Sequence, residues 1–237
     1  MIERDSVKAK ETPLLVGVIT SRDGLRIATR MKKPPDLFEL RLDHFAGAPD
    51  SVKNMIPFLP SPVIITARDF REGGAKQLSL QKRRGLLQRF LPQARFVDIE
   101  LRLLAALVSL FEAAQQQRIQ RILSVHDFRS TPSLRTMLAK ACEARSAGAE
   151  VFKIVTRVDK ASQLARLVEF MQKRPTGIKV TAMGVGKLGA ASRIDLSRLG
   201  SAMIYAYLGK TSLEGQPSLS RIRRLLQAKS QQRTRHH

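Results

Sequence analysis

The chain has 237 residues, 43% of them hydrophobic, so it can bury a substantial core and is not expected to be disordered. Its 42 lysine and arginine residues outnumber its 20 aspartate and glutamate residues, and the resulting formal charge of +22 attracts anionic substrates or nucleic acid without specifying a fold. The longest apolar run, residues 103–111, is too short to span a bilayer, and residues 1–13 are polar, so we expect a soluble, cytoplasmic protein without a membrane segment.

Short apolar segments bounded by turn residues recur along the chain and predict eight β-strands. They lie at residues 14–20, 37–43, 62–68, 96–101, 121–128, 150–158, 178–184 and 202–208. Segments with helical spacing lie between them and after them, among them residues 79–90, 103–117, 132–147, 160–173 and about 217–229. This alternation predicts a (β/α)8 TIM barrel formed by a single domain, residues 1–237, with a basic polar tail at about 230–237; a doubly wound open sheet is the alternative.

Five of the predicted strands alternate apolar residues with polar or ionisable ones. The polar positions are Glu39, Arg41, Asp43, Thr66, Arg68, Asp98, Glu100, Ser124, His126 and Lys153. Any one such strand would suit the edge of a sheet, with its polar face in water, but five strands are too many to be edges. We therefore expect these side chains to converge in the barrel lumen, at the carboxyl ends of the strands, where TIM-barrel enzymes place their chemistry.

Lys153 lies between Phe152 and Ile154 in "AEVFKIVTRV", a segment with the composition of a strand buried on both faces. A buried charge is costly unless it is paired or neutralised, so the side chain either reaches an edge, pairs with a carboxylate, or becomes a neutral amine. Because ionisable residues of neighbouring strands are expected to converge beside it, we interpret Lys153 as a candidate nucleophile.

Three further features are interpreted as structural. Cys142 has no partner for a disulfide, and too few histidines accompany it for a zinc site, so we assign no metal. The segment "GVGKLG", residues 184–189, fits a nucleotide-binding pattern, but it follows the seventh strand and lacks an acidic residue at the expected offset. We interpret it as a tight loop at the anion-binding end of a barrel. His44 is interpreted as structural or as a neighbour of the site.

Six segments, in chain order, resemble type I 3-dehydroquinate dehydratase, a family of shikimate-pathway enzymes. They are "FELRLDHF", "ITARDFREGG", "LSVHDF", "VFKIVT", "AMGVGKLGAASR" and "SLEGQPS". The resemblance covers nearly the whole chain and implies dehydration of 3-dehydroquinate to 3-dehydroshikimate through a lysine Schiff base, in aromatic amino acid biosynthesis, with no cofactor. It also implies that the protein is a homodimer. The expected binding partner is the small-molecule substrate, and no specific binding of nucleic acid is expected.

The resemblance also implies a role for individual residues. Lys153 would be the Schiff-base nucleophile, His126 the general acid and base, and Glu72 the group that orients His126. The remaining site residues would bind the substrate: Glu39, Arg41 and Arg68 at the ring hydroxyls, or holding one another in place, and Arg193, Ser212 and Gln216 at the carboxylate and neighbouring hydroxyls.

Two other functions remain open from the residues. An aldolase that forms a Schiff base with a phosphorylated sugar would share the lysine of the sixth strand, although Arg193 with Ser212 and Gln216 favours a carboxylate substrate. A basic nucleic-acid-binding protein would account for the charge but not for the converging polar residues. Because the sequence ends soon after its eighth unit, we expect no fused shikimate dehydrogenase.

Overall fold

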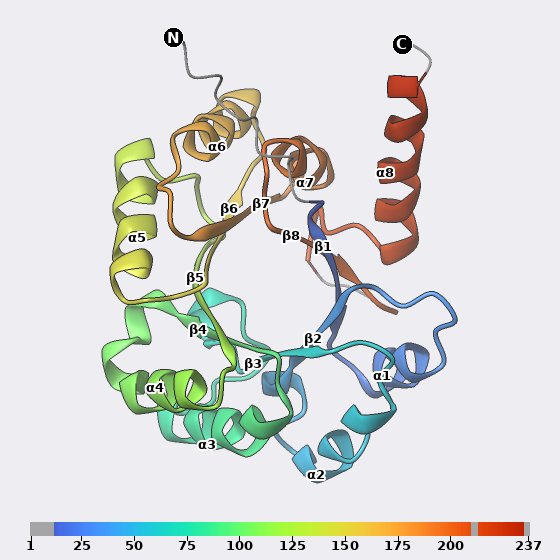
Figure 1. Ribbon diagram of the computed structural model, residues 1–237, viewed down its shortest axis with the longest axis vertical. Helices are drawn as coiled ribbons and strands as arrows, with labels where there is room; N and C mark the ends of the chain where they lie inside the picture. The colour runs from blue at the N-terminus through green and yellow to red at the C-terminus, as the bar shows by residue number, and fades with distance from the viewer. Residues whose placement is uncertain (1–11, 210–212, 235–237) are drawn as a thin grey trace, which may run out of the picture.

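The computed structural model describes residues 12–209 and 213–234. Within them, eight parallel strands are hydrogen-bonded in the order β7-β6-β5-β4-β3-β2-β1-β8 (Figure 1). The strands are β1 (Leu14–Ile19), β2 (Leu37–Arg41), β3 (Val63–Thr66), β4 (Phe96–Glu100), β5 (Gln120–Asp127), β6 (Val151–Arg157), β7 (Lys179–Val185) and β8 (Met203–Tyr207).

Helices follow the strands and surround the sheet from outside (Figure 1). The α-helices are α1 (Arg22–Thr29), α2 (Pro49–Lys53), α3 (Leu80–Phe90), α4 (Val108–Gln116), α5 (Leu134–Ser146), α6 (Ala161–Lys173), α7 (Gly189–Arg198) and α8 (Leu219–Thr234). Short 3₁₀ turns occur at η1 (Leu42–His44), η2 (Ile56–Phe58), η3 (Phe70–Glu72), η4 (Leu91–Gln93), η5 (Leu101–Leu103) and η6 (Ala105–Leu107).

The sheet curls into a nearly closed barrel, which confirms the predicted TIM-barrel fold and excludes the open sheet. Val16 of β1 is in register with Leu37 of β2 on one side and with Tyr205 of β8 on the other. The remaining gap lies between β7 and β8, where the backbone N–H of Ala202 donates to the carbonyl of Val180 at 2.8 Å. All eight strands therefore end at the same rim of one barrel.

Several predicted boundaries differ from the structure. Residues 42 and 43, predicted as the end of a strand, lie in η1, because the Asp43 carboxylate accepts hydrogen bonds from Arg41 and from the backbone N–H groups of Arg68 and Ala75. The helix predicted from residue 103 begins at Val108, after η5 and η6. The last helix begins at Leu219 and continues to Thr234, into the predicted tail, of which residues 235–237 lie outside the described residues.

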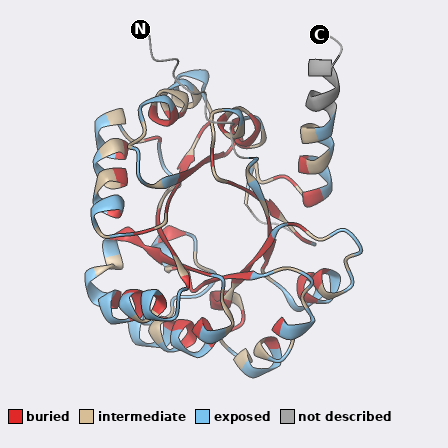
Figure 2. Cartoon of the chain, in the orientation of Figure 1, coloured by how far each residue is buried: buried red, intermediate tan, exposed pale blue. Residues whose placement is uncertain are grey.

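Buried residues lie along the barrel strands and on parts of the surrounding helices (Figure 2). The apolar ones form two sets, one inside the barrel and one between the strands and the helices. Outward-facing strand residues pack against the helices; Phe152 of β6 meets Phe170 of α6 edge-to-face, with 6.4 Å between ring centres. The inner set fills the lumen and consists mainly of Val16, Val18, Leu37, Ile64, Phe96, Ile122, Val151, Val155, Met183 and Met203. The inside of the barrel is therefore a packed floor with polar groups above it.

None of the helices in the described part of the chain is long and apolar enough to cross a membrane.

We predict that replacing Phe152 by alanine lowers the free energy of unfolding by about 3–5 kcal/mol, because the cavity left between β6 and α6 is fully enclosed. The matched control is Phe58→Ala, at a phenylalanine that is 68% exposed, which should change stability by less than about 0.5 kcal/mol. Denaturant unfolding of the three proteins measures both values. Equal effects of the two substitutions would contradict the assigned packing.

Candidate active site

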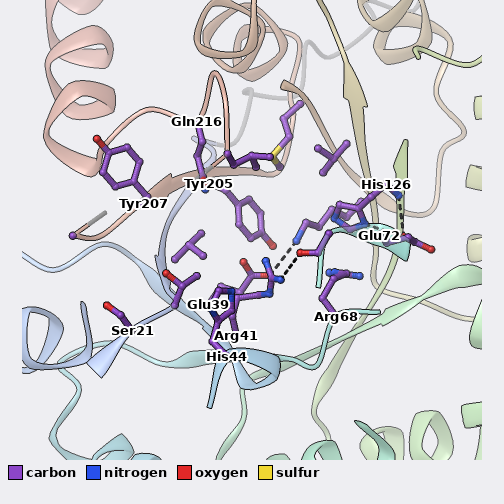
Figure 3. A pocket seen from close by; sticks show the side chains of 18 of the residues that line it. Ser21, Glu39, Arg41, His44, Arg68, Glu72, His126, Tyr205, Tyr207 and Gln216 are labelled. Carbon is purple, nitrogen blue, oxygen red and sulfur yellow. Dashed lines mark hydrogen bonds and ion pairs between the residues drawn. The ribbon is translucent and has the colours of Figure 1, made fainter. Parts of the chain in front are cut away.

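A pocket of about 830 Å³ opens at the carboxyl-terminal rim of the barrel (Figure 3). Eight of the nine residues that the sequence singles out for catalysis or binding line it: Glu39, Arg41, Arg68, Glu72, His126, Lys153, Arg193 and Gln216. The ninth, Ser212, lies outside the described residues. The pocket therefore brings together residues from β2, β5, β6 and α7 and from the segments that follow β3 and β8.

Lys153 lies at the base of this pocket with almost no exposure to solvent. Its Nζ is 2.9 Å from Asp98 Oδ2 and 3.2 Å from Glu39 Oε1, and it lies 4.0 Å from the centre of the Tyr205 ring. Of the three possibilities that the sequence left open, the structure shows pairing, with two carboxylates and the face of an aromatic ring. A positive charge at this nitrogen is stabilised from three sides.

Asp98 is held between Lys153 and Arg68. Arg68 Nη2 lies 2.8 Å from Asp98 Oδ2, and Arg68 Nη1 lies 3.4 Å from Glu100 Oε1 and donates to Ser124 Oγ at 2.7 Å. Burial opposes ionisation of Asp98, but the neighbouring Arg68 and Lys153 hold the pKa of its carboxyl well below the usual range. Burial likewise opposes the charge of Arg68, and the carboxylates of Asp98 and Glu100 outweigh it and raise the Arg68 pKa.

Glu72 reaches the site from η3, a turn that the sequence specifies at both ends. Asp69 caps its start by accepting from the Arg71 backbone N–H at 2.8 Å, and Gly73 ends it with a positive φ of 83°. A side chain at Gly73 would also collide with the Phe128 ring, since an added Cβ would lie 2.7 Å from it. Gly73 is therefore required by both backbone conformation and space, and Gly74 by space, since an added Cβ there would lie against the Arg68 carbonyl.

His126, on β5, is joined to Glu72 by two contacts with the same oxygen. Glu72 Oε2 lies 3.0 Å from His126 Nδ1 and also accepts from the His126 backbone N–H at 3.0 Å (Figure 3). Burial, followed by the positive charges of Arg68 and Lys153, lowers the pKa of His126 well below its usual range. The imidazole is therefore neutral at physiological pH, and with its Nδ1 proton held by Glu72, its Nε2 is free to accept a proton.

Arg193 differs from Arg68, because no carboxylate of the described residues lies within ion-pair distance of it. Its Nε donates to the Tyr205 carbonyl at 3.2 Å, and its Nη1 donates to the carbonyls of Gly184, Gly189 and Gly215 at 2.6, 2.8 and 3.2 Å. Burial alone lowers the pKa of Arg193 to about 10. A buried guanidinium that lines a pocket and lacks an anion is suited to an anionic ligand.

The glycine-rich segment 184–189 holds this arginine. Its carbonyls at Gly184 and Gly189 accept from the guanidinium, and a Cβ at Gly189 would lie 2.8 Å from the Gly215 carbonyl oxygen. Gly186 has a positive φ of 87°, and Asp159 accepts from the Lys187 backbone N–H beside it. In this chain the glycines thus allow the loops after β7 and β8 to pack closely around Arg193.

The two remaining polar residues from β2 differ in their surroundings. Glu39 is buried and accepts from Thr66 Oγ1 at 3.0 Å in addition to Lys153. Arg41 lies nearer the mouth, where it pairs with Asp43 at 2.8 Å and donates to the Gly73 carbonyl at 2.9 Å. Asp43 is fully buried and lies in η1 instead of on the strand where the sequence placed it, and it does not line the pocket.

Several other residues line the pocket that were not predicted from the sequence, among them Ser21, Met183, Tyr205 and Tyr207. The two tyrosines occupy alternate positions of β8, so the period-two pattern of a strand could have revealed them. Ser21 caps α1 through a hydrogen bond from the Gly24 N–H, and this capping signal gave no indication of a site. His44, interpreted as structural or as a neighbour of the site, also lines the pocket.

The family model of type I 3-dehydroquinase matches residues 15–233. The chain belongs to the type I 3-dehydroquinase family. It is 29% identical to a 3-dehydroquinate dehydratase of Thermococcus onnurineus over 216 residues, which cover 90% of this chain and 97% of that protein. It is 32% identical to a 3-dehydroquinate dehydratase of Shouchella clausii over 207 residues, which cover 82% of this chain and 81% of the relative.

Solved structures agree with this assignment. The 3-dehydroquinate dehydratase of Enterococcus faecalis superposes with a TM-score of 0.75 at 27% identity, covering 84% of this chain and 91% of that one. The enzyme of Geobacillus kaustophilus, at 24% identity, has the same fold, with a TM-score of 0.84 over 91% of this chain and 90% of that one. The resemblance found in the sequence is confirmed, and the chain is an enzyme of the lyase class.

The low pKa of His126 predicts how stability depends on pH. Below about pH 6.5 the unfolded chain binds a proton at this residue that the folded protein does not, so stability falls as the pH drops below that value. The slope attributable to His126 is up to about 1.4 kcal/mol per pH unit, and it should disappear in His126→Gln. Denaturant unfolding between pH 5 and 7 measures it; parallel curves for the two proteins would contradict the neutral, buried imidazole.

Proposed function

We propose that this protein dehydrates 3-dehydroquinate to 3-dehydroshikimate through a Schiff base on Lys153, as a step of the shikimate pathway. One observation carries the proposal: the pocket brings together a buried primary amine, a neutral histidine held by a carboxylate, and an arginine that has no carboxylate partner within the described part of the chain. An amine, a proton carrier and an anion-binding group are what the elimination of water from a hydroxy-keto acid requires.

The chemistry begins with attack of Lys153 Nζ on the substrate carbonyl. The resulting carbinolamine loses water to give an iminium, which withdraws electrons from the neighbouring carbon far better than a ketone does. His126 then removes a proton from that carbon, and the enamine expels the β-hydroxyl, which leaves as water after His126 returns the proton. Hydrolysis of the conjugated imine by a second water releases the product and regenerates the amine.

The surroundings of Lys153 support this sequence of steps. Nζ must lose a proton before it attacks, and Asp98 and Glu39 already accept its hydrogen bonds. Once the iminium has formed, its positive charge replaces that of the ammonium in front of the same carboxylates and the face of the Tyr205 ring. The positive charge at Nζ therefore faces the same carboxylates and the same aromatic ring before and after the covalent step.

The three arginines that line the pocket have different partners, which supports a different role for each of them. Arg193 would bind the substrate carboxylate together with Gln216 and Ser212, whereas Arg41 and Glu39 would contact ring hydroxyls. Arg68 is already paired with Asp98 and Glu100, which favours a role in holding Asp98 against Lys153 rather than in contacting substrate. The homodimer implied by the family resemblance and the cytoplasmic location expected from the sequence remain predictions, which sedimentation and fractionation respectively can test.

Turnover of 3-dehydroquinate, followed by the ultraviolet absorbance of the conjugated product, tests the activity. Borohydride added during turnover should trap substrate on Lys153, since only an imine is reduced under these conditions, and mass spectrometry of the digested protein should locate the adduct. Lys153→Met should reduce kcat by several orders of magnitude yet remain folded, because Asp98 retains Arg68 and Glu39 retains Thr66 as partners.

The matched control is Lys82→Met at an exposed lysine of α3, which should keep full activity and full trapping. A mass shift on a lysine other than 153 in the trapped protein, or normal turnover by Lys153→Met, would overturn the assignment of the nucleophile.

Replacing Arg193 by glutamine should weaken substrate binding by roughly 2–5 kcal/mol, about 30-fold or more in KM, because a desolvated carboxylate would lose its counterion. Arg198→Gln, at an exposed arginine of the same helix, is the control and should leave KM unchanged. Circular dichroism confirms that both variants are folded. An unaltered KM in folded Arg193→Gln would remove this residue from the binding site.

A further inference from the structure

Glu72 is bound on both sides. Its Oε2 contacts His126, and its Oε1 lies 2.8 Å from the Nε of Arg102, the middle residue of η5 at the end of β4. Arg102 also places its Nη2 3.0 Å from Asp69 Oδ2, at the start of the turn that carries Glu72. The guanidinium thus spans the two acidic residues of one turn, on the side away from the histidine.

We propose that Arg102 is a positioning residue that fixes the Glu72 carboxylate against His126 and sets how readily the imidazole takes up a proton. The proposal deepens the proposed function and depends on the role of His126 stated there. Arg102 does not line the pocket, so its effect on the reaction passes through Glu72.

The contact with Glu72 is the part of this arrangement that Arg102 alone supplies among the described residues. Asp69 has other partners, because Arg83 Nη1 lies 2.9 Å from its carboxylate and its own backbone N–H donates to Glu100 Oε1 at 2.8 Å. The turn therefore remains anchored without Arg102. The outer oxygen of Glu72, in contrast, would lose its ion pair.

The electrostatic effect has a definite sign. The positive charge of Arg102 partly neutralises the Glu72 carboxylate, so Glu72 stabilises a protonated His126 less than it would alone. Without Arg102 the carboxylate would stabilise the imidazolium more strongly, and the pKa of His126 would rise. The other charged groups that face His126 are Arg68 just after β3, Lys153 of β6, Asp98 of β4 and Glu39 of β2. All four remain in place when Arg102 is replaced, so the change can be assigned to one charge.

The charge and the geometry of Arg102 can be separated with two variants. Arg102→Gln removes the charge, whereas Arg102→Lys keeps the charge but loses the planar fork that reaches both Glu72 and Asp69. The matched control is Arg71→Gln, which removes a positive charge from the same turn at a side chain that is 80% exposed and lies 3.9 Å from Asp69. The side chain of Arg102 is 35% exposed, so replacement is compatible with folding.

The test measures the pKa of His126 by NMR titration of the imidazole, together with the pH profiles of kcat and KM. In Arg102→Gln the His126 pKa should rise by roughly 0.5–1 unit, a shift reduced by the partial exposure of Arg102. The acidic limb of the kcat profile should move to higher pH with it, because His126 must be neutral to remove the proton. The maximal kcat should fall roughly tenfold, as one charge-assisted hydrogen bond is lost, while KM changes less than about twofold.

The other variants distinguish positioning from a structural role. Arg102→Lys should restore the His126 pKa but only part of kcat, and Arg71→Gln should alter neither. Equal His126 pKa values in Arg102→Gln and Arg71→Gln would overturn the inference, even where His126→Ala abolishes turnover and so upholds the proposed function. Full turnover by His126→Ala would instead reject the proposed function, and the NMR shift alone would then decide what Arg102 does to the imidazole.

Discussion

A chain of alternating charges inside the barrel rim is the feature on which the site depends. Each member lies within 3.4 Å of the next, from the lysine on β6 to the histidine on β5. In order the groups are Lys153, Asp98, Arg68, Glu100, Arg83, Asp69, Arg102, Glu72 and His126. Burying one of the fully enclosed charges, such as Asp98 or Arg68, without a partner would cost several kcal/mol, so these groups are buried as pairs. The same series of contacts joins Lys153 to the neutral His126 through protein side chains.

The interior of the barrel has two layers, and the upper layer holds the charged groups of this series that the strands carry. The apolar floor, with residues such as Val16, Ile64 and Ile122, excludes water from below, and the strands above it present their polar residues at one level. In that dry setting a charge has large effects on its neighbours. Burial raises the pKa of Asp98, and the positive charges of Arg68 and Lys153 outweigh it, whereas at His126 burial and the same two charges all lower the pKa. The same surroundings thus keep an acid ionised and a base neutral.

The two buried arginines of the pocket show how pairing separates structural from binding roles. Arg68 is paired with the carboxylates of Asp98 and Glu100, and its pKa is raised. Among the residues that the structure describes, the hydrogen-bond partners of Arg193 are backbone carbonyls, and its pKa is lowered. Carbonyl dipoles orient a guanidinium without neutralising it, so Arg193 keeps an unbalanced charge facing the pocket. Gly189 and Gly215 make this possible, since a side chain at either position would collide with the backbone of the other loop and prevent the two loops from meeting around the arginine.

The sequence by itself determined the barrel, the helix-facing positions of its strands and most of the residues that meet in the pocket, because a period of two along each strand and the order of six family segments are properties of the chain alone. The apolar floor of the lumen was not predicted and is a finding of the tertiary structure. Only the tertiary structure decided which charges meet. Lys153 and its partners Asp98 and Glu39 lie on separate strands, and Asp43 leaves its strand to bind backbone N–H groups. Arg102 gave no sequence signal at all, because its role arises from the distance between β4 and the turn after β3, which is fixed by packing and not by spacing along the chain.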